Sequence, residues 1–492
     1  MKNCPDLPVQ MVFTAALKEE LPLNWLKSLN LKVFSLKALK AGAWKGQDKS
    51  DPDKSSLFFI VSGVGIAAAH ETALWIKENL RPLFVVNLGT VGGIGSGTDI
   101  GEWVLPGLAS NEQGETLPLD RRTPFPWPES INRRLGGALL SVEKPRFGDL
   151  PADWKKHQYL DMESFAYAKA FAGTGISFHA IKWVSDLSDS RGREQFQASL
   201  INFRQELQQV LAFLDKGEGQ DISVIIPVFN RKGWIAASVE SVLKQTLPAR
   251  EVIVVDDGSD DGTIDVLAPY KDRLTILVLP ENRGVAAARN AGIAEASCPW
   301  VCFLDSDDLW KADKLERQQR FLNAHPFYEI LQCEEVWIRN GRRVNPCRHH
   351  EKPRGWIWEP SLTRCLVSPS AVMMRRGLIE RLGGFDENLP VCEDYDLWIR
   401  ISRDHVVGLD PTPSVIKHGG HEDQLSGSYP AMDSFRVKAL LKALKKEKEM
   451  RYRDELIRVL RQKLTILIQG SRKRMRFEKC REYETILNSL IV

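Results

Sequence analysis

Three carboxylates stand within four residues of this 492-residue chain, directly after an apolar run. Residues 301–304 are typical of a strand, and Asp305, Asp307 and Asp308 follow them. Carboxylates this close repel one another unless a cation or water lies among them, and Mg²⁺ prefers a couple of carboxylates together with phosphate oxygens. Because open α/β sheets bind ligands at the carboxyl ends of their strands, the run suits a metal-bound nucleotide diphosphate. Taken alone, it fits an acidic turn capping a helix from Lys311 equally well.

The residues before this run predict the sheet that would hold it. An apolar run at 222–227 is typical of a buried strand, and a second strand at 251–255 leads into Asp256 and Asp257. Residues 274–293 supply a third strand, a turn and a helix. Strand–helix units in this succession predict a Rossmann-like half sheet with acidic groups at two strand ends. The Asp pair also fits an Asx-turn beside the glycine that follows, a role compatible with reading a base.

These segments resemble the inverting, metal-dependent glycosyltransferases of sequence family two, which have the GT-A fold. The motifs IIPVFN, VVDDGSDDGT, NRGVAAARN and FLDSDD stand in the family's order and spacing, within residues 222 to 426. The resemblance implies hexosyl-type transfer from a nucleotide sugar, with Mg²⁺ or Mn²⁺ neutralising the leaving diphosphate. The resemblance implies that Asp257 reads the base, with Asp256 beside it, and that Pro227 and Phe229 line the base pocket. It implies that Arg289 approaches the nucleotide. The implied DxD-type site consists of Asp305, Asp307 and Asp308, the last two as metal ligands.

A second acidic motif follows at 383–401, GGFDENLPVCEDYDLWIRI. Glu393 and Asp394 open a predicted helix there, and the family resemblance makes Asp394 the catalytic base, with Asp396 supporting it. Acidic residues at a helix start also stabilise the helix dipole, which is the alternative interpretation. In the closing motif IKHGGHEDQLSGS the resemblance implies a metal-binding histidine, for which His421 fits better than His418. Either histidine also fits a solvated loop.

The first 214 residues have a different pattern, in which short apolar runs alternate with helical segments. This alternation predicts an α/β domain with a largely parallel sheet. Two strands end in glycine-rich turns, at 62–65 and 89–97, where backbone N–H groups can approach a phosphate or a sugar. Acidic residues accompany other strand ends, on the side of the sheet where such folds bind ligands. They are Glu19, Glu20, Asp161, Glu163 and Asp186.

This domain resembles the nucleoside phosphorylases and nucleosidases, especially the methylthioadenosine and adenosylhomocysteine nucleosidases. The matching pieces are TAALKEE, VSGVG, VNLGTVGG, IGEWV, DMESFAYA and VSDLSD. The resemblance makes Asp186 the proton donor to a departing purine and Glu20 the group that activates water. It places Thr90, Met162 and Glu163 against the nucleoside, Glu163 on the ribose hydroxyls. Cleaving an N-glycosidic bond needs such acid assistance and a group that favours an oxocarbenium-like sugar.

The match departs from the family pattern in three places. Gly89-Thr90 replaces Gly-Ser, Gly101-Glu102 replaces Gly-Asp, and residues 107–160 do not match the region that lines the base. The identity of the base therefore stays open, as does the choice between hydrolysis, which Glu20 favours, and phosphorolysis. A domain that only senses a nucleoside is the competing interpretation. A scaffold with both sites inactive is a third, which the intact acidic sets disfavour.

Composition limits the classes of protein to consider. With 43% hydrophobic and 27% charged residues the chain is typical of globular proteins, and a net charge of +3 gives no general reason to expect nucleic-acid binding. Eight scattered cysteines without a CxxC pair favour reduced thiols. The first residues do not resemble a signal peptide, and no apolar run is long enough to span a bilayer. These features predict a cytoplasmic protein without a transmembrane segment.

The predicted organisation is α/β with two domains. We expect a nucleosidase-like domain at 1–214, a polar linker at 215–221, a GT-A domain at 222–429 and a helical tail at 430–492. The tail favours a cap on the catalytic domain with a solvated basic face, and a membrane-surface helix is the alternative. The expected partners are a nucleotide sugar, an acceptor that the sequence does not identify (a sugar, a lipid-linked glycan or a protein) and a purine nucleoside. Homo-oligomerisation through the first domain is also considered.

Overall fold

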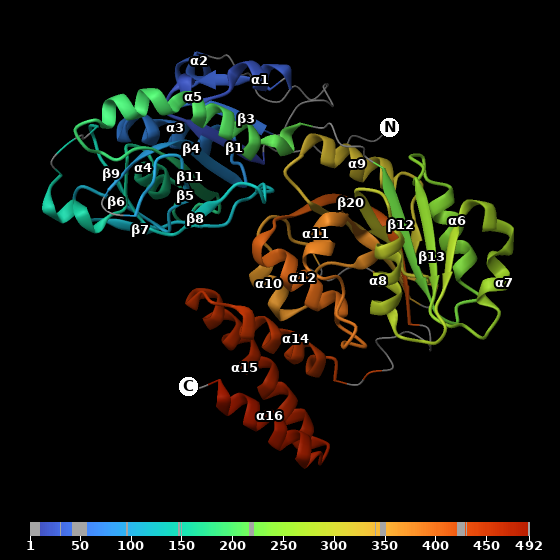
Figure 1. The fold of residues 1–492 in the computed structure, drawn as a ribbon. Coiled ribbons are helices and arrows are strands. Elements are labelled where there is room, and N and C mark those ends of the chain that lie inside the picture. The colour runs from blue at the N-terminus through green and yellow to red at the C-terminus, as the bar shows by residue number, and fades with distance from the viewer. Residues whose placement is uncertain are drawn as a thin grey trace. The chain divides into compact units, whose positions relative to one another are not determined.

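The computed structural model describes residues 10–29, 31–41, 57–94, 97–145, 148, 150–215, 221–339, 341–344, 351–420, 429 and 431–490. The chain divides into two compact units, Met1–Lys216 with Asn323–Phe327 and Gly217–Leu322 with Tyr328–Val492 (Figure 1). Each unit has its own mixed sheet. The predicted α/β architecture with two domains and a helical tail is therefore confirmed.

The first unit is organised by four parallel strands at the centre of an 11-stranded sheet. These strands are β3 (Leu57–Val61), β1 (Met11–Ala15), β4 (Phe84–Gly93) and β11 (Ser177–Asp186). Helices α3 (Ile66–Asn79) and α4 (Ser164–Phe171) pack on side chains such as Val12 and Val85. Helix α5 (Gly192–Val210) packs through Phe203, which contacts Trp103 and Trp183. Because both faces are covered, the strands are buried apolar runs.

The remaining strands of this sheet are short, and several come from the segment 107–160. They are β2 (Val33–Ser35), β5 (Trp103–Leu105), β6 (Leu108–Asn111), β7 (Thr116–Pro118), β8 (Arg133–Leu135), β9 (Ala138–Ser141) and β10 (Tyr159–Asp161). Short helices complete the unit: η1 (Lys18–Glu20), α1 (Leu23–Ser28), α2 (Leu36–Lys40), η2 (Ala152–Lys156) and η3 (Ala212–Leu214).

The second unit has a nine-stranded sheet in the order β14-β13-β12-β15-β19-β17-β20-β16, with β18 paired to β17. Its first four strands are parallel: β14 (Thr275–Val278), β13 (Glu251–Asp256), β12 (Ile222–Val228) and β15 (Trp300–Phe303). Antiparallel pairing begins where β19 (Val372–Arg375) joins β15. The other strands are β16 (Leu309–Trp310), β17 (Ile330–Arg339), β18 (Arg342–Val344) and β20 (Val407–Gly419).

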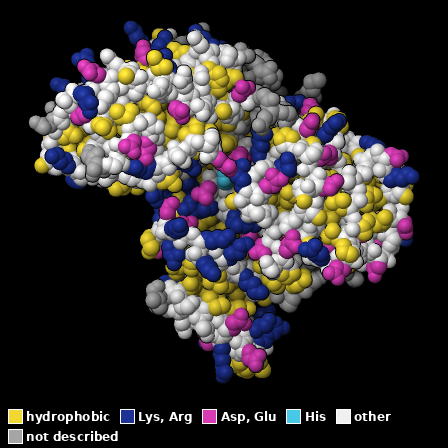
Figure 2. Space-filling view, in the orientation of Figure 1, with side chains coloured by type: hydrophobic (Ala, Val, Ile, Leu, Met, Phe, Trp, Pro, Cys, Tyr) yellow, Lys and Arg dark blue, Asp and Glu magenta, His cyan; other side chains and the backbone are white. Residues whose placement is uncertain are grey.

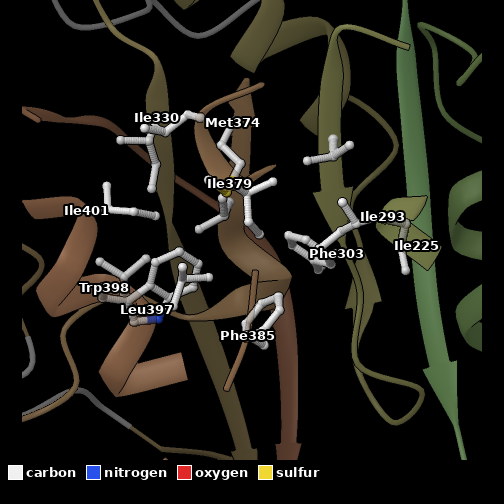
Figure 3. Close-up of a cluster of buried hydrophobic side chains, with 14 of the residues drawn as sticks. Ile225, Ile293, Phe303, Ile330, Met374, Ile379, Phe385, Leu397, Trp398 and Ile401 are labelled. Carbon is white, nitrogen blue, oxygen red and sulfur yellow. The ribbon is translucent and has the colours of Figure 1, made fainter. Parts of the chain in front are cut away.

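Helices pack on this sheet through one apolar core (Figure 3). In that core Ile225 of β12 and Phe303 of β15 lie with Ile293 of α8 (Val285–Glu295) and with Leu397 and Trp398 of α12 (Glu393–Asp404). The further helices of the unit are α6 (Ile235–Leu243), α7 (Thr263–Leu267), η4 (Ala268–Arg273), α9 (Lys314–Ala324), α10 (Trp358–Thr363), η6 (Pro369–Ala371) and α11 (Arg376–Arg381).

The tail forms three helices, α14 (Asp433–Lys446), α15 (Met450–Lys473) and α16 (Phe477–Ser489). Its predicted leucine face, which includes Leu456 and Leu464, is buried in a second core together with Tyr395 and Ile399 of α12 and Trp358 of α10. The prediction that the tail packs against the domain before it is thus confirmed. No helix among the described residues is long and apolar enough to cross a membrane.

Candidate active sites

In the second unit, parallel strands bring the predicted donor-site residues to one edge of the sheet. Strands β13, β12 and β15 are neighbours and run in the same direction. Phe229, Asp257 and Asp305 follow them and therefore lie at their carboxyl ends. Phe229 is 40% exposed and available to a ligand. Pro227 lies inside β12, where it is buried in register with Val255.

The Asp pair after β13 is held by backbone donors. The two carboxylate oxygens of Asp257 accept hydrogen bonds from the N–H groups of Arg283 and Gly284, each at 2.8 Å. Burial raises the pKa of Asp257 despite these bonds. Asp256 accepts from the N–H of Ser259 through Oδ2 at 3.0 Å, and its buried Oδ1 has no hydrogen-bond partner in the described structure. A buried acceptor without a donor is unfavourable in the absence of a ligand.

The acidic turn 305–308 leads into the short strand β16 and not directly into a helix. Asp308 is almost fully buried, and its carboxylate accepts from Ser370 Oγ at 2.7 Å and from the N–H of His418 at 3.2 Å. Burial raises the pKa of Asp308 to about 7. The imidazole Nδ1 of His418 contacts the carbonyl oxygen of Asp307 at 2.9 Å, so this histidine supports the turn.

A lysine that the sequence reasoning missed lies against this turn. Lys417 Nζ is 3.3 Å from Asp308 Oδ2 and 3.7 Å from Asp305 Oδ2, and it donates to Ser368 Oγ at 3.0 Å. Burial disfavours the charged form, yet the carboxylates of Asp308, Glu335 and Asp305 raise the pKa of Lys417 well above its ordinary value. Part of the negative charge of the turn is therefore neutralised by a side chain. Lys417 stands inside the closing motif IKHGGHEDQLSGS, and that position is the one sequence signal that could have indicated it.

The possible metal ligands at the acidic turn fit an ion that takes most of its other ligands from the nucleotide. Among the described residues, no three His, Cys, Asp or Glu side chains gather into a metal cluster. Asp308 already accepts from two donors, whereas Asp307 is half-buried. Mg²⁺ commonly takes one or two carboxylates and completes its shell with phosphate oxygens and water. His421 lies outside the described residues, so its assignment to the metal stays a prediction.

Arg289 joins the two acidic motifs. Its guanidinium donates to Asp305 Oδ1 at 2.8 Å and to Glu393 Oε1 at 2.6 Å, and it is only 3% exposed. Although burial opposes ionisation, Arg289 and Lys417 lower the pKa of Asp305. Burial and the neighbouring Asp394 raise the pKa of Glu393 to about 7. Helix α8 thus uses Arg289 to place the start of α12 beside the end of β15.

Asp394 stands at the first turn of α12, next to Glu393. Its Oδ1 accepts from the N–H of Tyr395 at 2.7 Å, and its Oδ2 accepts from the Cys365 thiol at 3.3 Å. The thiol also contacts the carbonyl of Val367 at 3.2 Å, and burial raises the pKa of Cys365 well above its ordinary value. Asp396 has a different role, because Arg400 and Lys442 bind its carboxylate at 2.8 and 2.9 Å. The Cys365 contact was not foreseen from the sequence.

In the first unit, Glu20 and Lys182 lie beside Gly89 and Thr90, which belong to the continuous strand β4 and do not begin a turn as the sequence predicted. Glu20 Oε1 accepts from the N–H and the hydroxyl of Thr90 at 3.2 and 3.1 Å, and burial raises the pKa of Glu20. Lys182 Nζ donates to Asn87 Oδ1 at 2.5 Å and lies 3.1 Å from Asp161 Oδ2. A Cβ added at Gly89 would lie 3.2 Å from Glu20 Oε1 and 3.6 Å from Lys182 Nζ. Glycine at this position therefore gives both groups room.

Glu163 lies at the start of α4 and accepts from the N–H of Gly65 at 3.0 Å. Burial is the main reason that its pKa is raised to about 7, with Lys182, Asp161 and Glu20 close enough to influence it. Met162 beside it is half-buried. The structure thus brings the predicted ribose-binding residues and Glu20 into one electrostatically connected group.

Asp186 ends β11, where a bulge interrupts the pairing with β4. Its oxygens accept from Ser185 Oγ at 2.8 Å and from the N–H of Ser188 at 2.9 Å. Burial raises the pKa of Asp186, which favours a protonated carboxyl. A Cβ at Gly92 would lie 3.0 Å from Asp186 Oδ1, so glycine there is needed for this arrangement.

The second unit is an α/β domain with carboxylates at the carboxyl ends of its parallel strands, the arrangement of a nucleotide-dependent transferase. Residues 223–382 match the family described as Glycosyl transferase family 2. A relative from Bacillus subtilis, "Putative teichuronic acid biosynthesis glycosyltransferase TuaG", is 33% identical over 37% of this chain and 71% of its own length. The chain belongs to glycosyltransferase family 2, and the prediction of a glycosyltransferase is confirmed.

Further proteins are similar to parts of the chain. The "UDP-Glc:alpha-D-GlcNAc-diphosphoundecaprenol beta-1,3-glucosyltransferase WfgD" of Escherichia coli is 33% identical over 37% of this chain and 70% of its own length. Two longer relatives are matched over only 33% of their length. An S-adenosylhomocysteine nucleosidase from Streptococcus pyogenes is 17% identical, with a TM-score of 0.31 over 42% of this chain and 94% of its own. The glycosyltransferase family indicated by the sequence motifs is found again in these comparisons.

Proposed function

We propose that the second unit transfers a hexosyl group from a UDP-sugar to a hydroxyl acceptor, with inversion at the anomeric carbon. The observation that carries this proposal is the Arg289 bridge, which brings Asp305 and Glu393 to one guanidinium. This bridge supports a site in which the acidic turn 305–308 holds the diphosphate and the separate acidic helix start faces the acceptor. A single displacement needs both a held leaving group and a base on the acceptor side.

The residues of the site divide this work. Asp257 is fixed by two backbone N–H groups to face the base, and the partnerless Oδ1 of Asp256 supports a ligand donor beside it. Asp307 and Asp308, with His421 as a further ligand, would hold Mg²⁺ or Mn²⁺ together with the nucleotide phosphates. When bound, the ion neutralises charge on the departing diphosphate. Asp394 takes the proton from the acceptor hydroxyl as that oxygen attacks the anomeric carbon and the bond to the diphosphate breaks.

The UDP assignment rests on the donor that the name of the Escherichia coli relative gives, UDP-Glc. A donor screen tests it directly. The purified full chain is incubated with UDP-, GDP- and dTDP-sugars and with Mg²⁺ or Mn²⁺, and release of the nucleoside diphosphate is followed by chromatography. We expect one UDP-sugar to be turned over and Asp307→Asn to lose at least a hundredfold in rate, while Asp313→Asn, an exposed Asp on the same stretch, keeps the parental rate. Turnover that is indifferent to chelation and to Asp307→Asn would remove the metal from the proposal.

We further propose that the first unit cleaves the N-glycosidic bond of a purine nucleoside. Three buried carboxyls with raised pKa values, Glu20, Glu163 and Asp186, support this function. Asp186 is suited to give a proton to the departing base, and Glu163 to hold the ribose hydroxyls. Glu20 would take a proton from the attacking water, whose oxygen bonds to the anomeric carbon. Thr90 fixes Glu20 for this role.

Release of free base decides between cleavage and mere binding. Adenine and hypoxanthine nucleosides are incubated with the full chain, with and without phosphate, and the base is measured by chromatography. Asp186→Asn is expected to lose about 10² to 10⁴-fold in rate, the usual contribution of placed proton donors. Tight nucleoside binding by calorimetry without any base release would replace the proposal by the sensor interpretation.

A further inference from the structure

The turn between α15 and α16 exposes an unusual combination of side chains. Eight consecutive residues, 472–479, are exposed, whereas Ser471 and Cys480 on either side are buried. Met475 is 78% exposed and Phe477 63% exposed, among the highest values for large apolar side chains in the described structure. In Figure 2, basic and hydrophobic side chains, with acidic ones among them, lie at the end of the helical hairpin, where Figure 1 places this turn. The segment 471–481 is called the hairpin tip below.

The hairpin tip concentrates positive charge. It contains six basic residues and one acidic residue, a net charge of +5, whereas the whole chain has a net charge of only +3. Arg472 forms an ion pair with Glu484. Lys473, Arg476 and Lys479 form no ion pair with any described residue, so their charges face solvent. The rest of the chain is therefore slightly acidic, and the basic character belongs to this tip.

The tip is an ordered turn that presents its side chains outward. The N–H of Arg476 donates to the carbonyl of Ser471 at 2.9 Å, and that of Met475 to the carbonyl of Arg472 at 3.0 Å. Met475 has a φ of 54°, a conformation that costs a non-glycine residue about 1–2 kcal/mol. Glycine would end α15 more favourably, so the turn itself does not require an exposed methionine there. Neither Met475 nor Phe477 belongs to the core that holds the tail on α12.

We propose that the hairpin tip docks on an anionic lipid surface. Basic residues near a negatively charged bilayer each contribute about 1 kcal/mol, and stable attachment needs a second signal besides charge. Met475 and Phe477 supply that signal because they can enter the boundary between headgroups and acyl chains. Glu478 is the one acidic residue of the hairpin tip, so little negative charge within 471–481 opposes contact with such a surface. This attachment is peripheral and independent of the sugar-transfer proposal.

Vesicle sedimentation of the full chain tests the proposal. We expect co-sedimentation with phosphatidylglycerol-containing vesicles, little with pure phosphatidylcholine, and release at high salt. The triple variant Lys473→Gln, Arg476→Gln, Lys479→Gln is expected to weaken binding at least tenfold. The matched control Lys77→Gln, Lys155→Gln, Lys156→Gln removes the same charge from exposed positions of the first unit and is expected to bind like the parent.

The apolar contribution needs its own pair of variants. Met475→Ser with Phe477→Ser is expected to lower binding several-fold, whereas Ile466→Ser, at a 59% exposed position of α15 outside the tip, is expected to leave it unchanged. Circular dichroism checks that each variant is folded. Equal binding to anionic and neutral vesicles, or tip variants that bind like the parent, would overturn the proposal. So would a tip that binds a short nucleic-acid duplex, measured by anisotropy, but no vesicles.

Discussion

Asp394 has one donor on each of its carboxylate oxygens, the Tyr395 N–H and the Cys365 thiol. These bonds fix the plane of the carboxylate while leaving lone pairs for an acceptor hydroxyl. Asp394→Asn keeps the shape but removes the basic oxygen, so transfer should fall at least a hundredfold while the donor still binds. Calorimetry with UDP and a transfer assay measure the two effects. The exposed Asp404→Asn at the other end of α12 is the control. A product with retained anomeric configuration would contradict the assignment.

Lys417 compensates the buried carboxylates of Asp305 and Asp308. Removing one partner of a buried ion pair typically costs 3–5 kcal/mol because the remaining charge is left unpaired. Lys417→Met is therefore expected to lower the melting temperature of the second unit clearly, and added Mn²⁺ should restore part of the loss. Lys311→Met, at an exposed position nearby, should melt like the parent. An unchanged melting temperature for Lys417→Met would show that the lysine does not balance these charges.

Glu163 gives the first unit a pH dependence of known sign. Burial raises its pKa from 4.5 to about 7, so between these values the folded state binds more protons than the unfolded state. Stability from this group is therefore fully present below about pH 4.5 and is lost as pH rises through 7. Thermal unfolding as a function of pH should show this decline, and Glu163→Gln should make it less steep, although Glu20 and Asp186, whose pKa values are also raised, keep part of it. Glu78→Gln, exposed on α3, should leave the decline as it is in the parent. A decline of unchanged steepness in Glu163→Gln would contradict the assignment to Glu163.

The sequence predicted the acidic residues of both sites because carboxylates after strands and at a helix start have recognisable spacing. It did not predict the groups that hold them, such as Ser370, Lys417 and Cys365. These come from elements distant in the chain, and single uncharged or basic residues have no spacing signature. Lys182 was missed for the same reason, since a buried lysine in a strand is identified only by the carboxylates around it.

At the scale of the element, α8 links packing to the donor site. A Cβ at Gly292 would overlap the side chain of Ile225 and lie 3.3 Å from Val255, so the helix rests directly on β12 and β13. Gly292→Ala should force α8 outward and destabilise the second unit by about 1–3 kcal/mol. It should also lower transfer, because Arg289 is on the same helix. Gly233→Ala, where a Cβ meets nothing within 4 Å, is the matched control. A variant as stable and active as the parent would contradict this close packing.

Elements were predictable where hydrophobic periodicity is strong. The runs at 222–227 and 251–255 became β12 and β13, and the leucine pattern of the tail became the buried face of α15. The segment 107–160 gave no such pattern, and it forms several strands of three or four residues that are stabilised by pairing with neighbours far along the chain. The strand β16 is shorter still and exists through its pairing with β20. Local sequence does not encode such tertiary pairing.

At the scale of the whole molecule, each unit has its own core and its own acidic site. The cores around Val12 and around Ile225 share no residue, and neither proposed mechanism uses a residue of the other unit. Substitutions at sites without shared partners usually have independent effects. Asp186→Asn should therefore lower base release about 10² to 10⁴-fold and leave sugar transfer at the parental rate. Asp394→Asn should lower sugar transfer about a hundredfold or more and leave base release at the parental rate. Both activities are measured on each single variant and on the double variant, with thermal unfolding as the check on folding. If either single substitution changes the other activity more than twofold while the protein stays folded, the two sites are coupled and the chain does not function as two separate enzymes.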